Sequence, residues 1–133
     1  MNSLDLEREG LAEWQRFAKP DERSLISSLP KSPGIYVIRY AQPLGRLLGQ
    51  SDIFYIGSAV NVNGIKGRIR QYFHPGPTQS TNKRILALLD TMDNLEISFL
   101  ECSSGLEAKE LERQLLIRYE KDHSELPPLN RRR

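Results

Sequence analysis

A small set of side chains in this sequence could act together on a phosphate ester. Two tyrosines lie in short motifs, GIY at residues 34–36 and YIG at residues 55–57, and Arg68 and Tyr72 follow at a spacing of four residues. Glu112 comes much later in the chain. Phosphodiester hydrolysis needs an activated water, neutralisation of the phosphate charge and help for the departing oxygen. Phenols, a guanidinium and a carboxylate are among the side chains that can take part in such chemistry.

The elements around these residues can be predicted from the pattern of apolar side chains. The β-branched and aromatic runs IYVIRY and IFYIGSA predict two strands, which most simply form an antiparallel hairpin joined by a long connection. Residues 63–73 predict a helix that carries Arg68 and Tyr72 on the same face. A third strand is predicted at residues 95–102, and a helix with an apolar stripe from about Leu106 to Lys121. The candidate site would therefore join two strands and two helices.

The remaining segments add helices to this unit. Residues 3–18 have apolar side chains at near-helical spacing, a short helix is predicted before Pro30, and another over residues 82–92. We therefore expect an α+β fold, a small three-stranded antiparallel sheet flanked by helices, with an extra N-terminal helix. The predicted division is an N-terminal helical extension at residues 1–31 and a catalytic domain at residues 32–133.

Charge is distributed unevenly along the chain. Residues 31–89 contain eight basic side chains and only one acid, Asp52, whereas residues 90–130 contain ten acidic and four basic side chains. The tail Arg131-Arg132-Arg133 is basic again. A basic segment of this kind supplies sequence-independent attraction to phosphates. On charge alone, however, a solvated surface would explain the pattern equally well.

Composition excludes several other classes of protein. The single cysteine, Cys102, cannot form an intramolecular disulfide, and two distant histidines cannot complete a structural zinc site. No apolar run approaches the roughly 20 residues of a membrane span, and the polar start does not read as a signal peptide. The expectation is a cytoplasmic protein that binds no membrane.

The ordered set of motifs, completed by Asn130 near the C-terminus, resembles the GIY-YIG nuclease family from about Pro33 to Asn130. Each tripeptide alone would be weak evidence, but every member lies on the element where the family would place it. The resemblance implies a metal-dependent endonuclease that hydrolyses phosphodiester bonds, with DNA as the expected substrate. It also implies a divalent ion, Mg²⁺ or Mn²⁺.

Roles for individual residues follow from the resemblance. Glu112 would hold the metal ion, and Tyr55 would be the general base. Arg68 would stabilise the transition-state phosphate, Tyr36 and Tyr72 would position water or phosphate, and Asn130 would help to order the site. The expected nucleic-acid contacts are Gly57, where the backbone could approach closely, and Ser58, Lys66, Arg70, Lys83 and Arg84.

Some alternatives stay open at the level of sequence. Without the other motifs, Glu112 would be an ion-pair residue, with Lys109 or Arg113 as its partner. Arg70 and Arg84 could equally form surface salt bridges, and His74 could belong to the site or be incidental. The interval from Tyr36 to Tyr55 is long, which suggests an inserted loop near the substrate.

The whole chain also allows a second function. A non-catalytic nucleic-acid-binding or adaptor domain could retain the same fold. Because the chain has no room for a separate DNA-binding domain, target specificity would come from the loops, the N-terminal helix, a homodimer or a partner protein.

Overall fold

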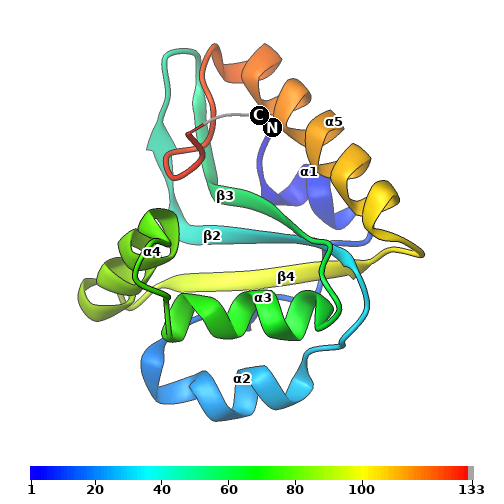
Figure 1. Cartoon of the computed structure of the whole chain (residues 1–133). Coiled ribbons are helices and arrows are strands. Elements are labelled where there is room, and N and C mark those ends of the chain that lie inside the picture. The colour runs from blue at the N-terminus through cyan, green and yellow to red at the C-terminus, as the bar shows by residue number, and fades with distance from the viewer. Residues whose placement is uncertain (132–133) are drawn as a thin grey trace.

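A four-stranded antiparallel sheet with helices on both faces forms the centre of the computed structural model, which describes residues 1–131 (Figure 1). Its strand order is β1-β4-β2-β3, so β3 lies at one edge. The elements in chain order are α1 (Ser3–Glu7), β1 (Gln15–Arg16), the 3₁₀ turn η1 (Lys19–Asp21), α2 (Glu22–Ser28), β2 (Gly34–Gly45), β3 (Gln50–Ala59), α3 (Gly64–Phe73), α4 (Ser80–Thr91), β4 (Leu95–Glu101) and α5 (Gly105–His123).

The α+β class is confirmed, and the sheet differs from the prediction by one strand. The two residues of β1 pair with β4 through Gln15 and Ile97, and a strand so short has no periodic signal of its own. The predicted helix over residues 3–18 was wrong beyond Glu7. Gly10 has a φ of +103°, a conformation that a helix cannot contain, and the chain then extends to reach the sheet.

The long connection between the first two strands was also predicted wrongly. Both strands continue through it, and only residues 46–49 form the turn between β2 and β3. The hairpin tip lies beside the end of α5 (Figure 1), where Leu48 N–H donates to the His123 carbonyl and Arg46 forms an ion pair with Glu125 at 3.0 Å. The extra residues therefore lengthen the hairpin and do not form a separate loop.

Each face of the sheet has its own apolar core. Side chains of β2 alternate between the two, so that Tyr36 and Ile38 face α2, α3 and α4, while Ile35 and Val37 face α1 and α5. Figure 1 shows α2 and α3 on one side of the sheet and α5 on the other. Strand β3, at the sheet edge, is therefore bordered by α3 on one face and α5 on the other.

The N-terminal segment packs into both cores. Leu6 and Leu11 belong to the α5 side, and Phe17, Leu25 and Leu29 belong to the α3 side. The proposed boundary after residue 31 stays a prediction. Residues before this boundary form part of the two apolar cores, and these cores support the elements that carry the candidate site.

Candidate active site

Four of the predicted site residues lie side by side at the β2–β3–α3 junction. In the register of the hairpin, Tyr36 is opposite Gly57 and Ile38 is opposite Tyr55, so both tyrosines project from the same face. Their ring centroids are 6.2 Å apart, and the Tyr72 ring lies 5.9 Å from Tyr36 and 6.3 Å from Tyr55. Residues 36 positions apart thus form one aromatic cluster.

The three phenols differ in their access to water. Tyr36 and Tyr72 are fully buried and their hydroxyl groups are hydrogen-bonded to one another. Burial raises the pKa of both phenols, and the nearby Tyr55 raises them further. Tyr55 is only half-buried. Tyr36 and Tyr72 therefore stay neutral at any ordinary pH, and Tyr55 is the phenol of the three that reaches solvent.

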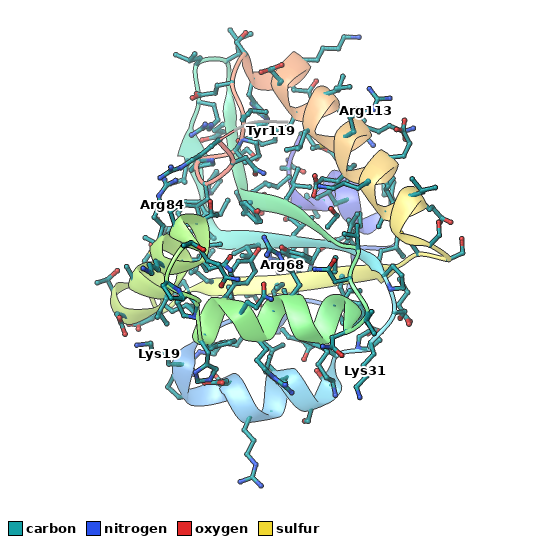
Figure 2. The ribbon with its side chains drawn as sticks, in the orientation of Figure 1. Lys19, Lys31, Arg68, Arg84, Arg113 and Tyr119 are labelled. Atoms are coloured by element: carbon teal, nitrogen blue, oxygen red, sulfur yellow. The ribbon has the colours of Figure 1, made fainter. Side chains whose placement is uncertain are left out.

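Arg68 lies against this cluster, between α3 and the sheet (Figure 2). Its Nε donates to the Tyr36 hydroxyl at 3.3 Å, its Nη1 donates to Gln71 Oε1 at 3.1 Å, and its Cζ lies 5.6 Å from the Tyr72 ring centroid. Burial by itself lowers the pKa of Arg68, but the neighbouring Tyr36 and Tyr72 and the hydrogen bond to the Tyr36 hydroxyl raise it, and the net shift is upward. The guanidinium is a fixed cation with further N–H donors for a phosphate.

Gly57 makes room for this arrangement. A Cβ at this position would lie 2.5 Å from the Cζ and hydroxyl oxygen of Tyr36 and 2.8 Å from Cε2 of Tyr55. The glycine of the YIG motif is thus required by the two tyrosine rings. It was predicted as a close approach to nucleic acid, and that role stays a prediction.

Asn130, in the C-terminal segment, is hydrogen-bonded to the edge strand β3. Its side-chain oxygen accepts from Ile56 N–H at 3.0 Å, and its side-chain nitrogen donates to the Ile56 carbonyl at 2.8 Å. Leu129 N–H also donates to the Phe54 carbonyl at 3.1 Å. The amide therefore pairs with β3 as a neighbouring strand would, and it holds the residue that follows Tyr55.

Glu112 lies on α5, on the other side of β3. Its side chain is 16% exposed, and Lys109 Nζ is 3.7 Å from its Oε1. Arg113, the alternative ion-pair partner, instead binds Glu110. Within residues 1–131 the structure gives Glu112 no hydrogen bond or ion pair with Tyr55 or Arg68, and no cluster of three potential acidic, histidine or cysteine ligands. The carboxylate is thus near the edge strand without touching the tyrosine cluster.

Lys109 connects the two halves of the site. It lines one surface hollow with Arg68 and Gln71, and a second hollow with Glu112. The first hollow is closed by Ser58 and the turn around residues 60–63. Lys109 and Gln71 were not assigned to the site from the sequence. The signal for Gln71 was its spacing of three residues from Arg68, whereas Lys109 is placed there by the packing of α5.

Tyr55 opens into another hollow. Its other lining residues include Ser80 and Thr81 at the start of α4, and Asn130 and Arg131 from the C-terminal segment. The first arginine of the basic tail therefore lies near the exposed edge of Tyr55. Arg132 and Arg133 lie outside the described residues.

The predicted nucleic-acid contacts are dispersed around these hollows. Ser58 is half-buried beside Gly57, Lys83 donates to the Pro77 carbonyl at 2.6 Å, and Arg84 lies on α4 (Figure 2). Lys66 and Arg70 project from a different side of α3 than Arg68. Among the described residues neither Arg70 nor Arg84 forms a salt bridge. His74 binds Glu22 and is absent from the tyrosine cluster.

The fold and its hairpin motifs define a class of protein: the chain folds as a GIY-YIG-like domain. It is similar to the N-terminal GIY-YIG endonuclease domain of UvrC from Thermotoga maritima bound to its catalytic magnesium ion. That match has 25% identity and a TM-score of 0.53, and covers 84% of this chain and 98% of the other. Two point mutants of the same domain, each bound to the catalytic divalent cation, match at 24% identity with a TM-score of 0.54, covering 86% of this chain and 99% of theirs.

Sequence comparisons add nothing to this structural likeness. No family model matches the chain, and no curated protein matches it. No helix within residues 1–131 is long and apolar enough to cross a membrane.

Proposed function

We propose that the protein is a metal-dependent endonuclease that hydrolyses phosphodiester bonds in DNA. The observation that carries this proposal is the cluster of three phenols and one guanidinium on the edge of a GIY-YIG-like sheet. Such a cluster offers a fixed cation for the phosphate and one phenol that reaches water. Neither feature is needed to stabilise a small α+β core.

In this proposal the three tyrosines have different tasks. Tyr55, half-buried, first gives up its own proton to solvent, and its phenolate then accepts a proton from the attacking water directly or through a relay. Tyr36 and Tyr72 are enclosed, so they act through Arg68: the Tyr36 hydroxyl accepts its Nε–H and the Tyr72 ring lies beside its guanidinium. Arg68 then donates its free N–H groups to the phosphate, whose charge grows during the reaction.

The chemistry of Glu112 fits a divalent cation. Within residues 1–131 its one ion-pair partner, Lys109, has its Nζ 3.7 Å from Oε1, beyond hydrogen-bonding distance, so both carboxylate oxygens can bind a metal ion. Mg²⁺ prefers oxygen ligands and keeps several waters, so a single carboxylate is an adequate anchor. When bound, the ion would supply charge neutralisation and a more acidic water. Glu112 would hold it beside the β3 edge, and Lys109 would turn from the carboxylate toward the hollow that Arg68 lines.

The same ion pair favours the second candidate, a non-catalytic nucleic-acid-binding domain. Lys109 offsets the charge of the carboxylate that is proposed to hold the metal. In that case the tyrosine cluster would serve only to pack the core. Nucleic-acid binding would then depend on the basic side chains alone.

A nicking assay on supercoiled plasmid separates the two functions. We expect the wild-type protein to cut with Mg²⁺ or Mn²⁺ and to stop when EDTA is added. Glu112→Ala should abolish cutting, and the control Glu110→Ala, two residues away on the exposed face of α5, should not. Tyr55→Phe should lower the rate by about 10²–10⁴-fold, as expected for a lost general base, whereas Tyr40→Phe should leave it unchanged.

Each result bears on one assignment. Cutting by Glu112→Ala at the wild-type rate would remove that residue from the metal site. Full activity of Tyr55→Phe would move the base elsewhere. Salt-sensitive DNA binding by the wild-type protein without any metal-dependent cutting would support the binding domain instead.

A further inference from the structure

Helix α3 has a basic stripe on the side that faces α2. Lys66 and Arg70, four residues apart, share one side of the helix, and His74 follows just after its last residue and lines the same surface hollow. Arg68 lies on the opposite side, toward the sheet. The helix therefore presents cations in two directions, and the proposed catalytic chemistry uses only one of them.

The stripe forms one wall of a groove whose other wall comes from the N-terminal segment. Lys19, from η1, and Arg23 and Ile26, from α2, line this other wall. Four lysines and arginines thus converge on one groove that contains a single acid.

Two acids, one of them outside the groove, offset only part of this positive charge. Glu22 is held by His74, and Lys19 forms an ion pair with Asp90 outside the groove. Among the described residues Arg23, Lys66 and Arg70 have no ion-pair partner. Cations placed close together without counter-charges repel one another, so the groove is more stable when an anion occupies it.

The opposite side of the molecule carries mixed charge. The outer surface of α5 has exposed acids, Glu107, Glu110 and Asp122, beside exposed cations, Lys109, Arg113, Arg118 and Lys121. Figure 2 shows Lys19 and Lys31 on the α2 and α3 side and Arg113, which pairs with Glu110, on the outside of α5. Lys109, Arg113 and Arg118 of α5 pair with acids. Among the described residues, cations without such partners gather over α2 and α3, so a polyanion is attracted to that side.

We propose that this groove between α2 and α3, the α2–α3 groove, binds the sugar–phosphate backbone of the DNA that flanks the cleavage site. This inference rests on the proposed function and adds a second binding region to it. The groove and Arg68 are separated by one helix, about 10 Å across, so one turn of duplex, roughly 34 Å long, can contact both. The N-terminal segment would then be a substrate-binding part of the domain.

The test compares two double variants that change the net charge equally. Arg23→Gln/Arg70→Gln removes one cation from each wall of the groove. Arg8→Gln/Lys121→Gln removes two exposed cations that line none of the hollows described above. Binding of a fluorescein-labelled DNA duplex is measured by anisotropy in EDTA over a series of KCl concentrations, and urea unfolding checks that both variants fold.

We expect the groove variant to bind tens of fold more weakly, roughly 60-fold at 0.1 M salt if two phosphate contacts are lost, because each contributes about 0.9 to the slope of log K against log salt. Its salt slope should fall by about 1.8, and the control should keep the wild-type slope. Equal behaviour of the two double variants would overturn the proposal. If the groove variant fails to fold, Lys66→Gln, with an expected slope change of about 0.9, takes its place.

The assay separates this proposal from the nuclease assignment because binding is measured without metal. If the wild-type protein never cuts DNA but the groove variant loses salt-dependent binding, the α2–α3 groove stands and the nuclease assignment falls. If the wild-type protein cuts and the groove variant binds like the control, the groove falls and the nuclease assignment stands.

Discussion

At the scale of the residue, the candidate site depends on a few side chains whose tasks are set by burial. Tyr36 and Tyr72 are enclosed and hydrogen-bonded to one another, whereas Tyr55 reaches solvent. The two motifs look nearly symmetric in sequence, yet their tyrosines have different environments. The chemistry available to each phenol is decided by its neighbours.

Gly57 gives a sharp test at this scale. Gly57→Ala should destabilise the protein by about 1–3 kcal/mol, as overpacking does, because its Cβ would lie 2.5 Å from Tyr36. Under the proposed function it should also lower the cleavage rate by displacing Tyr36 and Tyr55. Urea unfolding and the nicking assay measure the two effects. Gly45→Ala, where an added Cβ meets nothing within 4 Å, should leave both unchanged, and a neutral Gly57→Ala would contradict the packing argument.

At the scale of the element, the exposed edge of β3 is completed by the C-terminal segment. The side chain of Asn130 satisfies both backbone groups of Ile56, and Leu129 pairs with Phe54. An unpaired edge strand can slip or bind other strands. The segment after α5 therefore fixes the position of Tyr55 although it lies 74 residues away from Ile56 in sequence.

Asn130→Ala should lower the free energy of unfolding by about 1–3 kcal/mol, because two hydrogen bonds worth about 0.5–1.5 kcal/mol each are lost. Asn130→Asp should fall between the wild-type protein and the alanine variant, since a carboxylate still accepts from Ile56 N–H but cannot donate to its carbonyl. Urea titrations would measure these differences. A loss as large for the exposed control Asn94→Ala would show that the effect is not specific to the edge of β3.

At the scale of the whole molecule, the site is part of one of the two cores, so ionisation in the site affects global stability. Burial raises the pKa of Tyr36 and Tyr72 in the folded chain above the value of about 10 expected when unfolded. The folded protein keeps these protons while the unfolded chain releases them. The contribution of these two buried phenols to the free energy of unfolding is therefore fully present below pH 10 and is lost as the pH rises above it.

We expect the free energy of unfolding to fall above pH 10 by about 1.4 kcal/mol per pH unit for each of these phenols. Tyr36→Phe/Tyr72→Phe should flatten this slope, and Tyr40→Phe should keep it. Urea unfolding between pH 9 and 11.5 gives the measurement. An unchanged alkaline slope in the double variant would mean that the two phenols do not ionise on unfolding.

Much of this protein could be predicted from its sequence because helices and strands have local periods. The strands around Tyr36 and Tyr55, the helix that carries Arg68 and Tyr72, and the helix that carries Glu112 were all predicted and are present. The strand and the hairpin that were missed leave no local signal in the sequence, for two different reasons. Strand β1 is too short for a period, and the continued hairpin is stabilised by contacts with the end of α5.

The sequence alone determined the order of the motifs, the class of fold and the identity of the four residues that meet beside Gly57. Only the tertiary structure decided which phenol reaches water, why residue 57 is glycine, that Lys109 binds Glu112, and that α2 and α3 form a basic groove. These features depend on which faces of distant elements are packed together. Burial and hydrogen bonding between distant segments leave no periodic signal along the chain.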